Sequence, residues 1–147
     1  MKLGTIPIRR ALISVSNKHN LSDLGKFLVG LSVEIISTGG TAKYLKKEGL
    51  NVKEVSDLTG FPEILNGRVK TLHPKIHDPI LFDRDDKVSV KELKKMDSKP
   101  IDLVVVNLYP FEAILTGKGS KKDIIENIDI GGVALMRAAA KNFDHVM

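Results

Sequence analysis

The sequence contains no cysteine and no tryptophan, and only 5% of its residues are aromatic. Without cysteine the chain cannot form disulfides, use a thiolate nucleophile or hold zinc through sulfur. So few aromatic side chains argue against a stacking platform for single-stranded nucleic acid. No apolar run approaches the length needed to cross a bilayer. We therefore expect neither a nucleic-acid partner nor a membrane partner.

The N-terminal segment Met1–Pro7 lacks the apolar core of a signal peptide, so the sequence predicts a cytoplasmic protein. A chain of 147 residues with 42% hydrophobic residues can bury a substantial core, and we expect one domain over residues 1–147. The net charge of +5 would suit nucleic acid or small anionic ligands. Much of the excess lies in lysine pairs on predicted helices, which is typical of a solvated face; these are Lys46-Lys47, Lys94-Lys95 and Lys121-Lys122.

Predicted strands alternate with predicted helices along the chain. Apolar runs predict strands at Ala11–Val15, Val33–Ser37, Val52–Val55 and Ile101–Asn107. Helical spacing and capping residues predict helices from Leu21 (Asn20 as N-cap, Gly30 near the end), at Ala42–Glu48, Val88–Met96, from Ser120 through Asn127, and at Val133–Lys141. Phe143–Met147 has the composition to begin a further strand. The pattern predicts a three-layer α/β/α fold with a mostly parallel sheet.

The stretch Asn66–His77 contains three cationic side chains and two imidazoles but no carboxylate. Gly67 and Pro74 interrupt any helical period, so we interpret the stretch as a functional loop. Arg68 and Lys70 are two residues apart and would point to the same side of an extended backbone. With the hydroxyl of Thr71 they would suit a phosphate or another oxyanion. A solvated basic loop is the alternative.

Polar residues also follow the predicted strands, at Ser14–Lys18, Ser37–Thr41 and Asn107–Tyr109. In an open parallel sheet, ligands bind beyond the carboxyl ends of the strands. Thr38-Gly39-Gly40-Thr41 leads into a helix, whose first N–H groups and dipole can hold a phosphate. A plain capped turn would use the same residue types.

Three further residues could carry chemistry. Asp129 lies among apolar neighbours ahead of a helix, where it could also be an N-cap. Lys141 ends an alanine-rich helix, where it could also satisfy terminal carbonyl groups. Tyr109 could equally be a core residue or a dimer contact.

His73 and His77 have the i, i+4 spacing of a metal site on a helix. Pro74 lies between them, and no acidic ligand is close in sequence. We therefore interpret both as structural or substrate-contacting residues and expect no metal site.

Seven segments together resemble a known family, the inosine monophosphate cyclohydrolase domain, which is the N-terminal half of the bifunctional purine-biosynthesis enzyme. The segments are Ile13–Lys18, Ser37–Thr41, Gly60–Glu63, Gly67–Pro74, Val106–Phe111, Ile128–Gly132 and Arg137–Asn142. They occur in this order, and the resemblance runs from about Ala11 to the end of the sequence.

The resemblance implies a methylglyoxal-synthase-like α/β fold. It also implies a hydrolase-class enzyme that closes 5-formamidoimidazole-4-carboxamide ribotide to inosine monophosphate with loss of water, without metal or cofactor. The motifs match a catalytic group of Lys70, Tyr109, Asp129 and Lys141, with Lys141 as proton donor and acceptor. They match substrate-binding positions at Ser16, Asn17, Lys18, Thr38, Gly39, Gly40, Thr41, Arg68, Val69, Thr71, Asn107 and Ile130. We also expect a homodimer.

The chain departs from the family in two places. Asp78-Pro79 replaces a small residue and a glycine, so we expect a different loop backbone there. The chain also ends before the family's domain does, and the transformylase half is missing. We also expect the Lys141 amine to be buried, the environment in which a lysine can give up and regain its proton. A non-catalytic nucleotide- or phosphate-sensing domain is the main alternative function, and a basic nucleic-acid-binding domain is the third.

Overall fold

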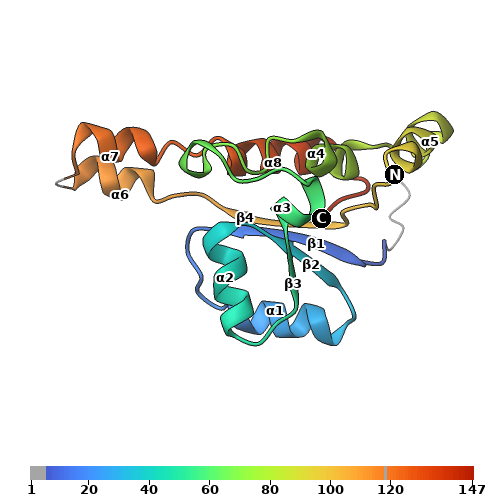
Figure 1. Cartoon of the computed structure of the whole chain (residues 1–147), viewed down its shortest axis with the longest axis horizontal. Helices are drawn as coiled ribbons and strands as arrows, with labels where there is room; N and C mark the ends of the chain where they lie inside the picture. Colours follow the sequence, from blue (N-terminus) through green and yellow to red (C-terminus); the bar gives the residue numbers. More distant parts are fainter. Residues whose placement is uncertain (1–5, 118) are drawn as a thin grey trace.

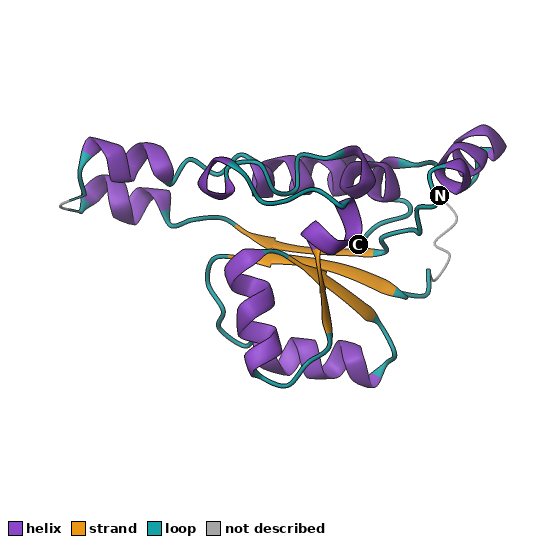
Figure 2. Ribbon diagram, viewed as in Figure 1, coloured by secondary structure: helices purple, strands orange, loops and turns teal. Residues whose placement is uncertain are grey.

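The computed structural model describes residues 6–117 and 119–147, apart from the side chain of Asn66. Its centre is a parallel sheet of four strands in the order β3-β2-β1-β4. The strands are β1 (Arg10–Val15), β2 (Glu34–Ser37), β3 (Val52–Glu54) and β4 (Leu103–Asn107). Helices lie on both faces of the sheet (Figures 1 and 2). The predicted three-layer, parallel α/β fold is confirmed.

Helices α1 (Leu21–Gly30) and α2 (Gly39–Lys47) cover one face of the sheet, and α4 (Pro74–Leu81) and α8 (Gly131–Lys141) cover the other. Helix α5 (Lys87–Lys95) lies at one end of the second layer. Helices α6 (Phe111–Thr116) and α7 (Lys121–Glu126) project from the opposite end as a pair (Figure 1). The short elements α3 (Val55–Thr59) and the 3₁₀ helix η1 (Leu65–Gly67) lie between β3 and α4.

Strand β1 separates two hydrophobic clusters because its successive side chains point to opposite faces. Ala11 and Ile13 pack in the cluster under α1 and α2. Leu12 packs with residues of α4 and α8 in the other. All three residues are fully buried, as expected for a strand in the middle of a parallel sheet.

The prediction of a loop throughout Asn66–His77 is wrong at its C-terminal end, because α4 begins at Pro74. Proline suits the first position of a helix, where its missing N–H would have no helical partner. His73 completes the start by accepting a hydrogen bond from the Lys75 N–H at 3.1 Å. Asp78 and Pro79 therefore lie inside a helix and not in a loop. Pro79 is buried, and its carbonyl accepts from the Ile101 N–H at 3.1 Å.

Three other local predictions need correction. Helices α3 and α6 occupy segments for which the sequence pattern predicted no helix. Asn20 precedes α1 as predicted, but in a left-handed conformation and without a side-chain cap. No strand is found among the described residues Phe143–Met147. Met147 nevertheless pairs with β4, donating to Asp102 O at 3.0 Å and accepting from Val104 N at 2.8 Å.

The lysine pairs and the capping residues agree with the sequence pattern. All six lysines of the three pairs are exposed on α2, α5 and α7. Ser120 and Asp123 form the predicted capping box at the start of α7. Across residues 6–117 and 119–147, no helix combines the length and apolar character needed to span a membrane.

Replacing Asp102 with alanine should lower the free energy of unfolding by about 3–5 kcal/mol, the usual effect of breaking a buried ion pair. The buried carboxylate accepts from the N–H groups of Arg9 at 2.8 Å and Arg10 at 2.9 Å, and it pairs with Arg84 at 2.8 Å. Urea denaturation would measure the change. The exposed Asp144 is the matched control, and Asp144→Ala should change stability by less than about 0.5 kcal/mol. Equal losses in the two variants would contradict the prediction.

Candidate functional site

Two adjoining cavities open at the carboxyl ends of the strands, with volumes of about 380 Å³ and 170 Å³. We call them together the strand-end cleft. Residues that line both cavities come from five separate parts of the chain; they are Ser14, Thr38, Lys70, Tyr109 and Asp129. The cleft thus lies where ligands bind in open parallel sheets.

The larger cavity has two independent features that favour an anion, although the carboxylates of Glu126 and Asp129 also line it. Arg68 and Lys70 both line it, which brings two cations to one wall. The N-termini of α2 and α8 also reach it, through Thr38 and Gly131 respectively. Helix N-termini carry unpaired N–H groups and the positive end of the helix dipole. An anion is the ligand that this wall would stabilise.

The first turn of α2 has N–H groups to spare. The N–H groups of Thr41 and Ala42 both donate to Thr38 O at 3.0 Å. Those of Gly39 and Gly40 come earlier and have no carbonyl within the helix to donate to. They are therefore suited to donate to a phosphate.

Both cations of the larger cavity are paired with carboxylates. The guanidinium of Arg68 donates through two nitrogens to Glu126 on α7. The pKa of Arg68 is raised, first by this hydrogen bond and second by the charge of Glu126. Lys70 Nζ lies 2.8 Å from Glu63 Oε1. An incoming anion would have to exchange with these two carboxylates.

Two glycines allow these groups to approach one another. Gly67 has φ +83°, and a Cβ there would collide with the Lys70 side chain and the Glu63 carboxylate. A Cβ on Gly131 would lie 2.7 Å from Thr71 Oγ1. Any larger residue at either position would displace a group that lines the cleft or pairs with a lining residue.

At the smaller cavity, two of the predicted substrate-binding residues, Asn107 and Thr41, hold the loop after β1 in position. Asn107 accepts from the N–H of Asn17 at 3.1 Å and donates to its carbonyl at 2.8 Å. The Thr41 hydroxyl donates to Val15 O at 2.9 Å and accepts from Val15 N at 3.2 Å. These side chains fix the backbone that carries Ser16 and Lys18 to the cavity.

Three of the four predicted catalytic residues, Lys70, Tyr109 and Asp129, line both cavities. Asp129 is half-buried, and its Oδ1 accepts from Gly132 N at 2.7 Å. The N-cap of α8 is Ile130, so Asp129 is not the N-cap that its sequence position allowed, although its carboxylate holds an N–H of the first turn.

Lys141 is placed differently from the sequence expectation. It is the last residue of α8, about 15 Å along the helix axis from Gly131, and its side chain is exposed. Among the described residues, those lining the cleft do not include it. The expectation of a buried amine is therefore wrong for the isolated chain, because α8 carries Lys141 away from the strand ends.

Most of the predicted substrate-binding residues line the cleft: Ser16, Lys18, Thr38, Gly40, Thr41, Arg68, Thr71, Asn107 and Ile130. Gly39 lines a small neighbouring cavity together with Lys70. Asn17 and Val69 have local roles. Asn17 Oδ1 accepts from the His19 N–H at 2.9 Å, and Val69 forms an antiparallel bridge with Ile64.

Sequence reasoning placed Ser14 in the polar stretch after the first strand but not among the predicted site residues, and it did not single out Glu126. Ser14 Oγ lies 3.1 Å from Thr38 Oγ1, and its position at the end of the first strand could have identified it. Glu126 is 58 residues from Arg68, and no sequence period connects the two. His73 and His77 occupy the first turns of α4, where His77 Nδ1 is 3.4 Å from His73 O, in agreement with a structural role.

The chain belongs to the MGS-like domain family, whose family model matches residues 20–134. It is 57% identical over 141 residues to the "Bifunctional purine biosynthesis protein PurH" of Elusimicrobium minutum, covering 95% of this chain and 27% of that protein. The protein of the same name from Rhodospirillum rubrum is 56% identical over 144 residues, covering 98% of this chain and 27% of that protein. The chain thus spans about a quarter of the length of these relatives.

The fold is also similar to a solved structure described as "Crystal structure of ForH". The TM-score is 0.81 at 34% sequence identity, and the match covers 95% of this chain and 72% of that chain. The resemblance drawn from the seven sequence segments is confirmed by these comparisons.

Proposed function

We propose that this chain is an inosine monophosphate cyclohydrolase, which closes the purine ring of 5-formamidoimidazole-4-carboxamide ribotide with loss of water. The observation that carries the proposal is the strand-end cleft. Its larger cavity combines two cations with two helix N-termini. Lys70, Tyr109 and Asp129 line both the larger and the smaller cavity. The names of the 55–57% identical relatives support a role in purine biosynthesis.

The phosphate of the ribotide would bind in the larger cavity, beside Arg68 and the helix N-termini. Arg68 offers a planar fork of donors, Thr71 a hydroxyl, and Gly39 and Gly40 their backbone N–H groups. Glu126 and Glu63 would then release the cations with which they pair. Anchoring the phosphate would direct the imidazole ring toward Lys70, Tyr109 and Asp129.

Ring closure joins the carboxamide nitrogen to the formyl carbon of the same molecule. Holding these two poorly reactive groups in contact removes a large entropic part of the barrier. As the nitrogen–carbon bond forms, the formyl oxygen gains negative charge, which Lys70 and the Tyr109 hydroxyl would stabilise. Asp129 would accept the proton lost by the nitrogen. The formyl oxygen takes up one proton to become a hydroxyl, and a second proton lets it leave as water. The former formamide nitrogen loses its proton as its double bond to carbon forms, so the two protons lost by the nitrogens equal the two gained by the oxygen.

The direct test is to follow conversion of the formamido ribotide to inosine monophosphate by ultraviolet absorbance. We expect turnover by the 147-residue chain without added metal or cofactor. If the chain binds inosine monophosphate but does not form it, the regulatory, nucleotide-sensing alternative would be favoured.

Arg68→Ala and Glu126→Gln should change substrate binding in opposite directions. Arg68→Ala removes a charged contact to the phosphate and should raise KM about 10- to 100-fold with a smaller change in kcat. Glu126→Gln removes the carboxylate that competes for Arg68 and should lower KM. Steady-state kinetics would measure both. Glu112→Gln, on the neighbouring helix α6, is the matched control. An unchanged KM in Arg68→Ala would contradict phosphate anchoring.

We further propose that the chain forms a homodimer through one apolar surface. Exposed apolar side chains gather on α6, α7, α8 and the segments between them: Leu108, Phe111, Leu115, Ile125, Ile128, Ile130, Val133 and Met136. Leu115 is 55% exposed and Ile128 is 52% exposed. The pair α6 and α7 lies outside the layers that cover the sheet (Figure 1). A gathering of exposed apolar side chains on neighbouring elements is typical of a protein–protein interface.

A dimer would also give Lys141 a role. Val133, Arg137 and Lys141 follow one another at four-residue spacing, so they lie on the same exposed face of α8. If this face packs against a second copy, Lys141 approaches that copy and not its own cleft. We propose that Lys141 acts in the cleft of the partner subunit.

A further inference from the structure

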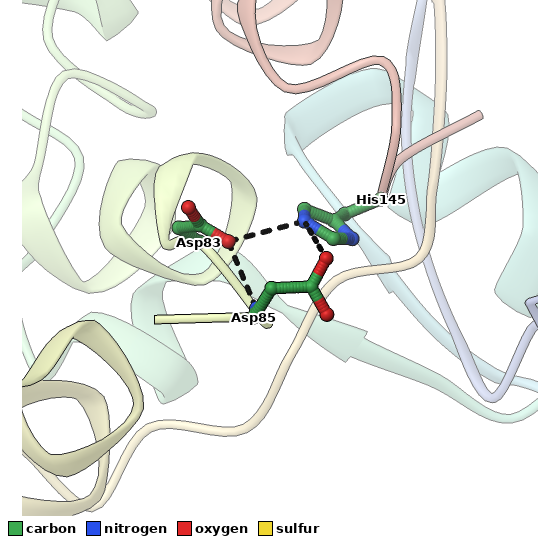
Figure 3. Close-up of side chains that lie close together, drawn as sticks. All are labelled: Asp83, Asp85 and His145. Atoms are coloured by element: carbon green, nitrogen blue, oxygen red, sulfur yellow. Dashed lines mark hydrogen bonds and ion pairs between the residues drawn. The ribbon is translucent and has the colours of Figure 1, made fainter. Parts of the chain in front are cut away.

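We propose that Asp83, Asp85 and His145 form a binding site for a divalent transition-metal ion of the zinc or cobalt type. The three side chains point toward one another beside the end of α4 (Figure 3). None of them lines the strand-end cleft. One potential ligand atom from each lies within 4.8 Å of the others. The proposal does not depend on the proposed enzymatic function.

The geometry is close to that of a metal centre. His145 Nε2 lies 3.3 Å from Asp83 Oδ1 and 4.0 Å from Asp85 Oδ2. Ligands at about 2.1 Å from a zinc ion are separated by roughly 3.0–3.5 Å in octahedral or tetrahedral geometry. The first separation fits directly. The second requires a small rotation of the Asp85 side chain, which is 93% exposed and free to make it.

Several contacts hold the ligands in place before any ion binds. The Asn142 side-chain amide donates to Ile80 O at 2.7 Å and to Phe82 O at 2.9 Å, which fixes the end of α8 against the end of α4. Asp83 Oδ1 accepts from the Asp85 N–H at 2.8 Å. The ring of His145 is largely buried, with 14% of its side chain exposed. Segments 62 residues apart thus meet in a defined arrangement.

The two carboxylates also lack a permanent cation. Among the ion pairs of the described residues, those of Asp83 and Asp85 are with His145. The intervening Arg84 turns away, to Asp102 at 2.8 Å and Ile101 O at 3.1 Å. The pKa of Asp83 is lowered, chiefly by the hydrogen bond from the Asp85 backbone. The site therefore offers negative charge and one imidazole to an incoming cation.

The donor set indicates the class of ion. Imidazole nitrogen suits zinc, cobalt, nickel and copper, whereas magnesium and calcium prefer oxygen ligands throughout. Three protein ligands would leave further positions to water. Since the site joins the segment before α5 to the end of α8, a bound ion would stabilise the attachment of the C-terminal segment to α4.

The test is isothermal titration of the full chain, free of any affinity tag, with zinc chloride, and of the variants His145→Gln and Asp85→Asn. We expect one ion per chain. Each variant should weaken binding by at least about 10- to 100-fold, the effect of losing even an outer-shell partner. Cobalt should give a visible absorption band that both variants lose. Zinc should raise Tm in the unchanged chain and not in the variants.

Two controls separate this site from other histidines and acids. His77→Gln removes a histidine of α4 that is not part of the proposed site, and Asp144→Asn alters an exposed acid next to His145 in the sequence. Both should bind zinc as the unchanged chain does. Asp85 makes no other side-chain contact among the described residues, so Asp85→Asn remains folded and decides the matter even if His145→Gln does not fold. Absence of zinc binding, or binding unchanged in Asp85→Asn, would overturn the proposal.

Discussion

Replacing Lys70 with alanine should lower kcat for ring closure by about 10²–10³-fold, the usual effect of removing one oxyanion-stabilising donor. Lys70 lines both cavities of the strand-end cleft, and its ammonium group is held there by Glu63 at 2.8 Å. Its charge is therefore placed where the formyl oxygen would become negative. Arginine at this position keeps the charge but moves it, so Lys70→Arg should retain partial activity.

Steady-state and single-turnover assays would measure this loss. Lys43, an exposed lysine on α2, provides the control, and Lys43→Ala should leave kcat unchanged. Circular dichroism and Tm would confirm that Lys70→Ala is folded. A folded Lys70→Ala chain that turned over at the normal rate would exclude the proposed oxyanion role.

A mixture of two inactive chains should recover activity if Lys141 acts in the partner's cleft. Lys141→Ala alone should lose about 10²–10⁴-fold in kcat, the usual contribution of a general acid or base. In a symmetric dimer, random exchange with Lys70→Ala chains makes about half of the dimers mixed, and each mixed dimer has one intact cleft. The mixture should therefore recover about a quarter of the activity of the unchanged chain.

The outcomes of the mixing experiment are distinct. Recovery that needs both variants, and that grows with the time allowed for exchange, would place Lys141 in the partner's cleft. Two inactive variants that never recover on mixing would mean that Lys70 and Lys141 serve one cleft of the same chain. The exposed position of Lys141 at the end of α8 argues against that second result.

Much of the fold could be predicted because the information is local. The run Leu103–Asn107 and its neighbour β1 are apolar, so composition alone indicates two strands of a parallel sheet. Strand β1 is buried inside the sheet as expected, but β4 is an edge strand and only half-buried, which composition did not indicate. Because parallel strands end at a common edge, the polar residues that follow them had to meet there. The common edge of the strands and the resemblance to the family together allowed Lys70, Tyr109 and Asp129 to be assigned to one site.

Helix α4 could not be predicted in the same way. Pro74 and Pro79 both interrupt a helical pattern in the sequence. The helix forms because Ile76, Pro79 and Ile80 are buried, with the two isoleucines packing in one cluster with Leu135 of α8. Tertiary packing of an apolar face outweighs local propensity in a helix this short.

The sequence by itself determined the parallel sheet, the polar residues at the strand ends and the family, because each depends on residues close together in the chain or on whole motifs. The tertiary structure decided which charges pair. Arg68 meets Glu126 across 58 residues, and Asp83 meets His145 across 62. It also decided that Lys141 is exposed. A helix sequence shows which residues share a face, but only the packing of the other elements determines which face they cover.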